Sequence, residues 1–271
     1  MKLLSRIYMW LVFALLYAPI FVLIIYSFNE GGSFAEYTGI SPKWYVEMFN
    51  DSAALLSLKN SLVLAVCAAA LATLIGTFAS LGIDRMRNRY VKATVNSLTN
   101  VPMMNPDIVT GVSMMLLFVT VGVWLPFLDL FGFGTMLIAH TTFSLPYVIL
   151  SVLPRFRQFD NSLREAAMDL GCTPTQSFFK VELPQILPGI LSGFLMAFTL
   201  SLDDFVISHF VSSPDFQTLP LYIYNQTAHE VKFSMYALCT LIILAILALL
   251  LLVNFAGSIG DRTKRRKGAT Q

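Results

Sequence analysis

Six stretches of this chain are predominantly apolar and about 20 residues long, which is the length an α-helix needs to cross the hydrocarbon core of a membrane. We place them at residues 7–28, 61–83, 101–125, 135–153, 186–210 and 235–256. We expect the third to be broken early, by Pro102 and Pro106. Lys, Arg, Asp and Glu make up only 13% of the sequence, about half of their share in a soluble domain. The sequence therefore predicts an all-α polytopic membrane protein with six transmembrane helices in a single domain, 1–271.

Basic residues are distributed unevenly between these stretches. With the N-terminus in the cytoplasm, fifteen of the 18 Lys and Arg residues fall on the inner side and three fall outside. Because Lys and Arg are retained on the cytoplasmic side of membrane proteins, this count predicts that both termini are cytoplasmic. The basic run at residues 261–267 is most simply a topology signal, and it also favours contact with anionic membrane lipid rather than with nucleic acid.

A polar stretch between the fourth and fifth apolar segments, at residues 154–185, carries unusually complete helix signals. Asp160 is a good N-cap for a first helix, and Gly171 suits the left-handed position that closes it. A T-x-x-Q capping box with proline in the first turn then starts a second helix, at Thr173, Pro174 and Gln176. We expect Leu183-Pro184 to end that second helix. The stretch therefore predicts two short helices joined by a tight turn.

Two interpretations of this stretch are open from its residues: a long loop that folds on its own helices, or a docking element for a cytoplasmic partner. Its order, E-A-A, x-x-x-G, a spacer, then a β-branched residue, x and Leu-Pro, resembles the EAA loop of ABC-importer permeases. Val181 stands where that family more often has Ile. The resemblance implies that this EAA loop (154–185) fits a groove on an ATP-hydrolysing subunit. The matching positions are Glu165, Ala166, Ala167, Gly171, Leu183 and Pro184.

Three carboxylates lie within the predicted spans, where an ionisable group costs roughly 2.5–3.5 kcal/mol by insertion scales. Asp203 and Asp204 come late in the fifth span, toward its outer side, and Asp107 follows a proline in the third. No Lys or Arg lies inside the six spans to neutralise them, so they are candidates for a path that attracts a cationic solute. A structural interpretation is also open. Asn105 would then cap a helix whose dipole Asp107 complements, while one of the paired aspartates faces the outer interface and the other pairs with a neighbouring helix.

Segments spread over the chain resemble a more specific group, the permeases of spermidine/putrescine importers. The similarity runs from about residue 17 to residue 221, and the Pro-Asp-Ile-Val and Ser-Leu-Asp-Asp segments are the ones that suggest polyamines. The matching segments are Tyr17-Ala18-Pro19, Tyr26-Ser27-Phe28-Asn29, Trp44-Tyr45, Pro106-Asp107-Ile108-Val109, Ala139-His140-Thr141-Thr142-Phe143, 165–171 and 198–204.

This resemblance implies a type I ABC-importer permease fold and a C-type permease subunit in the bacterial cytoplasmic (inner) membrane. It implies three kinds of partner: a dimer of ATP-binding subunits, a second related permease subunit and an extracytoplasmic polyamine-binding protein. It also implies alternating access, in which ATP closes the ATPase subunits, the EAA loops move and the helix bundle opens outward. ATP and Mg²⁺ would bind to the partner ATPase, and this chain would carry no cofactor, metal or catalytic residue.

The sequence itself contains no G-x-x-x-x-G-K-[ST] stretch for binding ATP. Its three cysteines and three histidines are scattered without the spacing of metal ligands. We therefore expect a transport subunit rather than an enzyme. Two alternatives stay open: an importer permease for another solute, such as another organic cation, Fe³⁺ or thiamine, and an ATP-independent channel or carrier.

Overall fold

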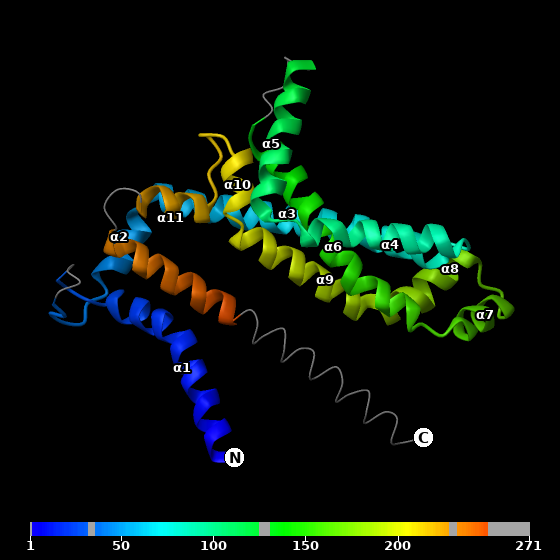
Figure 1. Ribbon diagram of the computed structural model, residues 1–271, viewed down its shortest axis with the longest axis horizontal. Helices are drawn as coiled ribbons and strands as arrows, with labels where there is room; N and C mark the ends of the chain where they lie inside the picture. Colours follow the sequence, from blue (N-terminus) through cyan, green and yellow to red (C-terminus); the bar gives the residue numbers. More distant parts are fainter. Residues whose placement is uncertain (1, 32–35, 125–130, 228–231, 249–271) are drawn as a thin grey trace. The chain divides into compact units, whose positions relative to one another are not determined.

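The computed structural model describes residues 2–31, 36–124, 131–227 and 232–248. Among these residues the regular elements are helices, and the two β-bridges are isolated pairs. The helices are α1 (Lys2–Tyr26), α2 (Lys43–Asn50), α3 (Ser52–Arg85), α4 (Arg89–Met104), α5 (Asp107–Trp124), α6 (Phe133–Arg157), α7 (Asn161–Asp169), α8 (Pro174–Ser177), the π-helical turn η1 (Phe178–Glu182), α9 (Leu183–Asp203), α10 (Val206–Val211) and α11 (Leu219–Thr227), followed by an apolar helix at Phe233–Ala248 (Figure 1).

Five helical segments in the described part of the chain are long and apolar enough to cross a membrane. They comprise α1, α3, α5, α6 and the continuous segment that ends with α9. Together with the shorter apolar helix Phe233–Ala248, they overlap the six predicted spans. The prediction of an all-α, multi-pass membrane protein is therefore confirmed. Residues 249–256 of the predicted sixth span lie outside the described residues.

The chain divides into two compact units. The first contains α1, α2 and the helix Phe233–Ala248. Within it, the indole of Trp44 donates to the carbonyl oxygen of Asn29 at 2.6 Å, and its ring centroid lies 5.3 Å from that of Phe233. The second unit, residues 56–224, contains the EAA loop and all three carboxylates proposed for the solute path. The single domain 1–271 stays a prediction.

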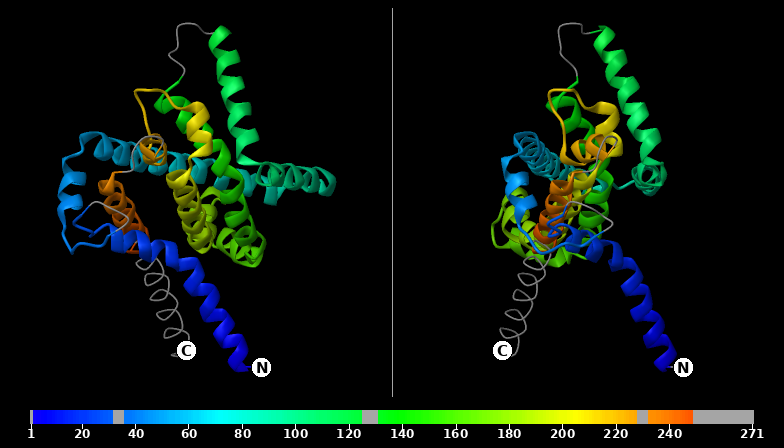
Figure 2. Two further views of the ribbon diagram at one scale, coloured as in Figure 1. Left: turned by 60° about the vertical axis from the view of Figure 1, so that its left-hand side comes forward. Right: turned by 90° about the vertical axis from the view of Figure 1, so that its left-hand side faces the viewer.

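The core of the second unit forms where α6 and α9 lie side by side, which Figures 1 and 2 both show. Glycine allows this close approach, because a Cβ added at Gly189 would lie only 3.1 Å from the carbonyl oxygen of Ser151. Small residues serve the same purpose where membrane helices cross. The buried side chains of this core come from α3, α6, η1 and α9: Ala69, Ala72, Val148, Val152, Phe156, Phe178, Ile186 and Ala197.

The third span is broken early, as predicted, but only at one of the two prolines. Residues 101–104, including Pro102, form the end of α4, and α5 begins at Asp107, directly after Pro106. The chain turns sharply between the two helices (Figure 2). The reason is Pro106, since the residue before a proline is disfavoured in the helical conformation, and Asn105 accordingly has a ψ of 134°.

The fifth span was predicted as one helix over 186–210, and this prediction is wrong. α9 ends at Asp203, Asp204 is extended with a ψ of 121°, and α10 begins at Val206. The side chain of Asp204 accepts hydrogen bonds from the amides of Ile207 and Ser208, at 3.2 and 2.8 Å. Because an aspartate that binds the free amides of a helix start favours a new helix over continuation, the span breaks at this residue.

The second helix of the EAA loop does not end at Leu183-Pro184, contrary to the prediction. α8 and η1 run directly into α9, whose first turn contains Pro184. In η1 the N–H of Leu183 bonds to the carbonyl of Phe178, five residues earlier. A proline has no N–H and crowds the preceding turn. We attribute the continuity to the π turn, which inserts one extra residue just before Pro184.

Candidate functional site

A buried histidine of α6 connects the two halves of the broken fifth span. His140 is 1% exposed. Its Nδ1 lies 2.7 Å from the hydroxyl of Ser201 in α9, and its Nε2 lies 3.1 Å from the hydroxyl of Ser208 in α10. The same Nε2 is 3.5 Å from the carboxylate of Asp204. One side chain therefore bonds to both helices and lies beside the residue that separates them.

The carboxylate of Asp204 faces the interior of the second unit, where its side chain is 7% exposed. It accepts the two backbone hydrogen bonds from the first turn of α10 and lies beside His140. A buried charge needs partners of this kind. The geometry therefore favours a structural role for Asp204, as the residue that starts α10.

Asp203 differs from its neighbour, because its side chain is exposed at the last position of α9. No salt bridge to Asp203 is found among the described residues. A carboxylate at the C-terminal end of a helix lies near the negative end of the helix dipole, and Asp204 adds a second negative charge next to it. A cation beside Asp203 would relieve both repulsions.

The fold places Asp107 close to this break, although the two are about a hundred residues apart in the sequence. α5 and α10 lie side by side and run in the same direction (Figure 1). They touch at Gly111, where an added Cβ would lie 3.5 Å from the carbonyl oxygen of Val206. Asp107 is exposed four residues before Gly111, on the same face of α5 and about one 5.4 Å turn away. The helix starts of α5 and α10 thus lie at the same end of this pair.

A groove with a volume of about 750 Å³ opens where α4, α5 and α6 meet, and its lining includes residues on both sides of Asp107 in the sequence but not Asp107 itself. Asn105, which was predicted to cap α5, instead donates from its side-chain amide to the hydroxyl of Thr110 at 3.2 Å, and both residues line the groove. Grooves of this volume are common for small-molecule sites. Its lining contains both polar and apolar side chains, including Asn105, Thr110, Ser113, Met114, Leu117 and Phe143.

The first helix of the EAA loop begins and ends as its sequence predicts. The carboxylate of Asp160 accepts the amide hydrogen of Ser162 at 3.0 Å, and hydrogen bonding to Ser162 lowers the pKa of Asp160 below its ordinary value. At the other end Gly171 has a φ of +90°. The amides of Gly171 and Cys172 bond to the carbonyls of Met168 and Ala167, at 2.9 and 3.0 Å. This pair of bonds is the Schellman motif, so the predicted N-cap and left-handed glycine are both confirmed.

The second helix of the loop starts with the predicted capping box. The amide of Gln176 donates to the hydroxyl of Thr173 at 3.3 Å, and the Gln176 side chain accepts the amide hydrogen of Thr173 at 3.2 Å. These bonds satisfy two of the amides that a helix start leaves free. The loop is therefore a well-defined structural element rather than an irregular connection.

The six EAA positions divide between the interior and the surface. Ala167 is buried and Leu183 packs against the core of α3, α6 and α9. The other four positions are exposed: Glu165, Ala166, Gly171 and Pro184. Three large apolar side chains of the loop are exposed as well: Leu163, Leu170 and Phe179. Leu170 is the most exposed of them, at 87%. Apolar groups gathered on one exposed element favour a site for a protein partner.

Sequence reasoning missed two residues of this region. The first is Glu182, which occupies the position marked x in the motif, between Val181 and Leu183. Its side chain is only 4% exposed, and it forms an ion pair with Arg85 at 3.0 Å. His140, which the sequence shows only as one of three scattered histidines, carries the network described above. In both cases the sequence signal was a single ionisable residue within or at the edge of an apolar stretch.

Comparison with known proteins gives the family of this chain. Residues 72–266, well over half of its length, match the family described as "Binding-protein-dependent transport system inner membrane component". The chain belongs to this family.

Relatives in the same family are similar along most of the chain. The putrescine transport system permease protein PotI of Escherichia coli K12 is 40% identical over 234 residues, which cover 86% of this chain and 83% of PotI. The spermidine/putrescine transport system permease protein PotC of the same organism is 37% identical over 267 residues, covering 98% of both chains. The PotC protein of Haemophilus influenzae is 39% identical over 249 residues, covering 92% of this chain and 94% of that protein.

Solved structures agree with the family assignment at the level of the fold. A bacterial ABC transporter involved in the import of the acidic polysaccharide alginate superposes with a TM-score of 0.75 at 14% identity, covering 93% of this chain and 95% of the other. The MetNI methionine ABC transporter gives a TM-score of 0.54 at 19% identity, covering 77% and 96%. At these identities the likeness shows the fold alone, and it confirms the predicted type I ABC-importer permease fold.

Membership of the binding-protein-dependent family has two direct consequences. The chain is a multi-pass permease subunit of the inner membrane, consistent with its apolar helices. It is a transport subunit and not an enzyme, because in such importers a separate subunit hydrolyses ATP.

Proposed function

We propose that this chain is the C-type permease subunit of an ATP-driven ABC importer that carries spermidine and putrescine across the bacterial cytoplasmic membrane. The observation that carries the proposal is the 37–40% identity with polyamine permeases over most of the chain. The exposed carboxylate of Asp203 at a helix end supports it, because such a group is stabilised by a passing cation.

The proposed solute path runs past Asp203 and Asp107. A polyamine carries ammonium groups separated by methylene chains, so it needs carboxylates spaced along a surface that is otherwise partly apolar. Asp203 and Asp107 are exposed near the paired starts of α5 and α10, and the adjoining groove contains apolar side chains such as Met114 and Phe143. In this proposal Asp204 supports the path by holding the break, and its own charge is used within the protein.

Coupling to ATP would take place at the EAA loop. The loop presents Glu165 and Ala166 at its surface together with the exposed apolar side chains Leu163, Leu170 and Phe179. We propose that this surface fits a groove on an ATPase dimer, which binds ATP and Mg²⁺. Both termini and the EAA loop then lie on the cytoplasmic side, as the distribution of basic residues predicts. Closure of the ATPases would move the loop and open the bundle outward.

Two further partners complete the proposed importer. A second, related permease subunit would pair with this chain to enclose the path, and an extracytoplasmic binding protein would deliver the polyamine. A relative in fold, the alginate transporter, has been solved in complex with a periplasmic protein that binds alginate pentasaccharide. The segments predicted to lie outside, residues 29–59, 125–134 and 211–234, are the proposed receiving surface for a polyamine-binding protein.

Reconstituted transport tests this function. The chain would be purified with its co-expressed permease, ATPase and binding protein and placed in liposomes. We expect uptake of radiolabelled spermidine that requires internal ATP and is competed by unlabelled putrescine, but not by thiamine or Fe³⁺. Uptake that neither polyamine competes would assign the importer to another solute. Uptake that proceeds without ATP would favour a channel or a secondary carrier.

A further inference from the structure

An ionic cluster at the cytoplasmic end of α3 connects the EAA loop to the rest of the second unit. One amino group of the Arg85 guanidinium donates to both carboxylate oxygens of Glu182, at 3.1 and 3.0 Å. Arg164 of α7 lies 4.0 Å from the same carboxylate. Glu182 is buried in η1, whereas Arg85 is the last residue of α3. The two helical parts of the EAA loop and α3 therefore share one buried negative charge.

The residue next to Arg85 extends this cluster to α4. The ammonium group of Lys92 donates to the backbone carbonyl of Asp84 at 2.7 Å and lies 3.7 Å from the Asp84 carboxylate. Carbonyls in the last turn of a helix have no partner within the helix, so Lys92 satisfies one of them and pairs with a charge at the same time. The first turn of α4 is thus attached to the same turn of α3 that holds Glu182. We call these five residues (Asp84, Arg85, Lys92, Arg164 and Glu182) the ionic junction.

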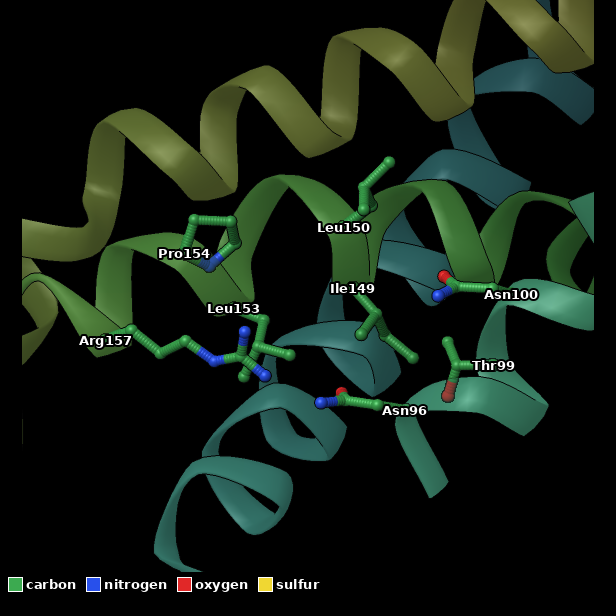
Figure 3. Close-up of a pocket in the computed structure, with 8 residues that line it drawn as sticks. All are labelled: Asn96, Thr99, Asn100, Ile149, Leu150, Leu153, Pro154 and Arg157. Atoms are coloured by element: carbon green, nitrogen blue, oxygen red, sulfur yellow. The ribbon is translucent and has the colours of Figure 1, made fainter. Parts of the chain in front are cut away.

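Apart from this attachment, α4 packs on the rest of the unit through Val95, which lies against the buried side chains of Ile83, Ile149 and Leu153. None of its 16 residues is buried. It lies against α6 across a cavity of about 160 Å³, which Figure 3 shows between polar side chains of α4 and mainly apolar ones of α6. Asn96 and Asn100 face Ile149 and Leu153 there, while the neighbouring Val95 packs against the same two side chains. Dense packing of side chains is what normally fixes one helix against another, and the cavity leaves part of the contact between α4 and α6 unfilled, so α4 has room to shift on α6.

The far end of α4 forms one wall of the groove. Val101, Pro102 and Met104 line it, and the sharp turn at Asn105 leads directly into Asp107. A helix of 16 residues is about 24 Å long. A small rotation at its attached end therefore displaces the groove wall and the Asp107 turn at the other end.

We propose that the ionic junction is the link through which the EAA loop sets the position of α4, and with it the groove and the turn of Asp107. Glu182 and Arg85 are positioning residues in this link. The side chain of Glu182 is buried and that of Arg85 is half-exposed. Leaving the buried carboxylate without its partner is unfavourable, so Arg85 follows Glu182 when the loop moves. The inference rests on the proposed function in one respect, namely that the EAA loop is the element that an ATPase moves.

The proposal is tested directly by measuring the distance between α4 and α6 in the complete transporter. Cys67, Cys172 and Cys239 would be replaced by Ser, and spin labels attached through Ser97→Cys on α4 and Leu150→Cys on α6. We expect the distance between the labels to change when ATP and vanadate close the ATPase. Glu182→Gln should abolish that change, and the matched variant Arg87→Gln, a neighbouring arginine outside the junction, should retain it. A normal distance change in Glu182→Gln would overturn the proposal.

A second measurement is the amount of polyamine imported per ATP hydrolysed. A purely structural role of the two residues would not change this ratio. Arg85→Gln and Glu182→Gln should each lower the polyamine imported per ATP hydrolysed by roughly fivefold or more, within the usual range of coupling between sites. The double variant should lose about as much as either single variant, since the link is broken only once. Losses that multiply in the double variant would contradict a shared link.

A reversed ion pair provides a second variant for the same test. If Glu182→Gln fails to insert, the reversed pair Arg85→Glu with Glu182→Arg restores an ion pair, and it should restore the distance change; a stable reversed pair without that change would overturn the link. The label measurement needs no transported solute. If the importer carries another solute, the change in label distance is therefore still expected. If the ionic junction is not the link, wild-type spermidine uptake is still expected.

Discussion

The carboxylate of Asp204 lies 3.5 Å from Nε2 of His140 and points into the protein, away from the surface that its neighbour Asp203 occupies. Consecutive residues of a helix point about 100° apart, and here the helix also ends between them. Two adjacent carboxylates of the same chemistry thus lie in different environments. We therefore expect Asp203 to act on the solute and Asp204 to act on the stability of the fold.

Replacing Asp203 by Asn should impair polyamine uptake without preventing assembly. The amide keeps the size of the side chain and removes its charge. An ammonium about 4 Å from a carboxylate gains about 4 kcal/mol at an effective dielectric constant of 20, and a third of that energy is already about a tenfold effect. We expect uptake of spermidine to fall about tenfold or more while the purified complex keeps its composition and melting temperature.

Asp204→Asn is the matched comparison, and it should act mainly on stability. An amide retains only one acceptor oxygen for the amides of Ile207 and Ser208, so roughly 1–3 kcal/mol of stabilisation is lost for a buried donor left unpaired. The melting temperature of the complex should fall. If Asn at Asp107, Asp203 and Asp204 together left spermidine and putrescine uptake unchanged, the acidic path would be wrong and the three residues would be caps and interface groups.

His140→Ala should destabilise the break between α9 and α10. The substitution leaves the hydroxyls of Ser201 and Ser208 and the carboxylate of Asp204 without their shared partner, at roughly 1–3 kcal/mol for each buried group that finds no replacement. Thermal unfolding in detergent would measure the loss. His209→Ala is the control, because His209 is exposed and, in the described part of the chain, its ring lies against aromatic side chains such as that of Phe205. An equal loss in both variants would contradict the special position of His140.

Gly171→Val should abolish transport while the subunit still inserts into the membrane. A Cβ at Gly171 would meet no atom within 4 Å, so the obstacle is the backbone rather than a clash. A φ of +90° is rarely adopted by residues with a side chain, and forcing it on a β-branched residue costs of order 1 kcal/mol or more. Uptake and membrane content would be measured side by side.

Two variants check the reason for that effect. Gly171→Asn should retain much of the uptake, because asparagine tolerates positive φ better than other residues. Gly82→Ala should be neutral, since Gly82 lies within α3 and has open space around it. Normal uptake by Gly171→Val would show that the turn is not needed for coupling.

The N-cap of α7 should weaken in acid. Hydrogen bonding to Ser162 lowers the pKa of Asp160 in the folded protein, so its stabilising contribution is complete above the ordinary pKa of an aspartate, about 3.9, and is lost as the pH falls through the lower folded value. The protection factors of the α7 amides, which correct for the slower intrinsic hydrogen exchange in acid, should therefore fall below about pH 4. Asp160→Asn should remove this pH dependence while preserving the cap, and Asp160→Ala should open α7 at neutral pH as well.

Local signals in the sequence were sufficient for the parts of the EAA loop that depend on neighbouring residues. Asp160, Thr173, Gln176 and Gly171 were identified in their capping and turn positions because a cap needs only the few residues around it. The family motif added the interpretation as a docking element. The same local rules failed at Leu183-Pro184, since a proline can follow a π turn as well as end a helix, and this choice depends on the packing of η1 into the core.

The sequence by itself determined the all-α membrane class, because twenty apolar residues in succession can only satisfy their backbone groups in a membrane as helices. The tertiary structure decided what the ionisable residues do. It buried Asp204 beside His140, left Asp203 exposed, brought Asp107 to the same end of the α5–α10 pair and joined Glu182 to Arg85, 97 residues away. The role of a charge depends on the burial and the partners that distant segments provide, and no local pattern encodes these.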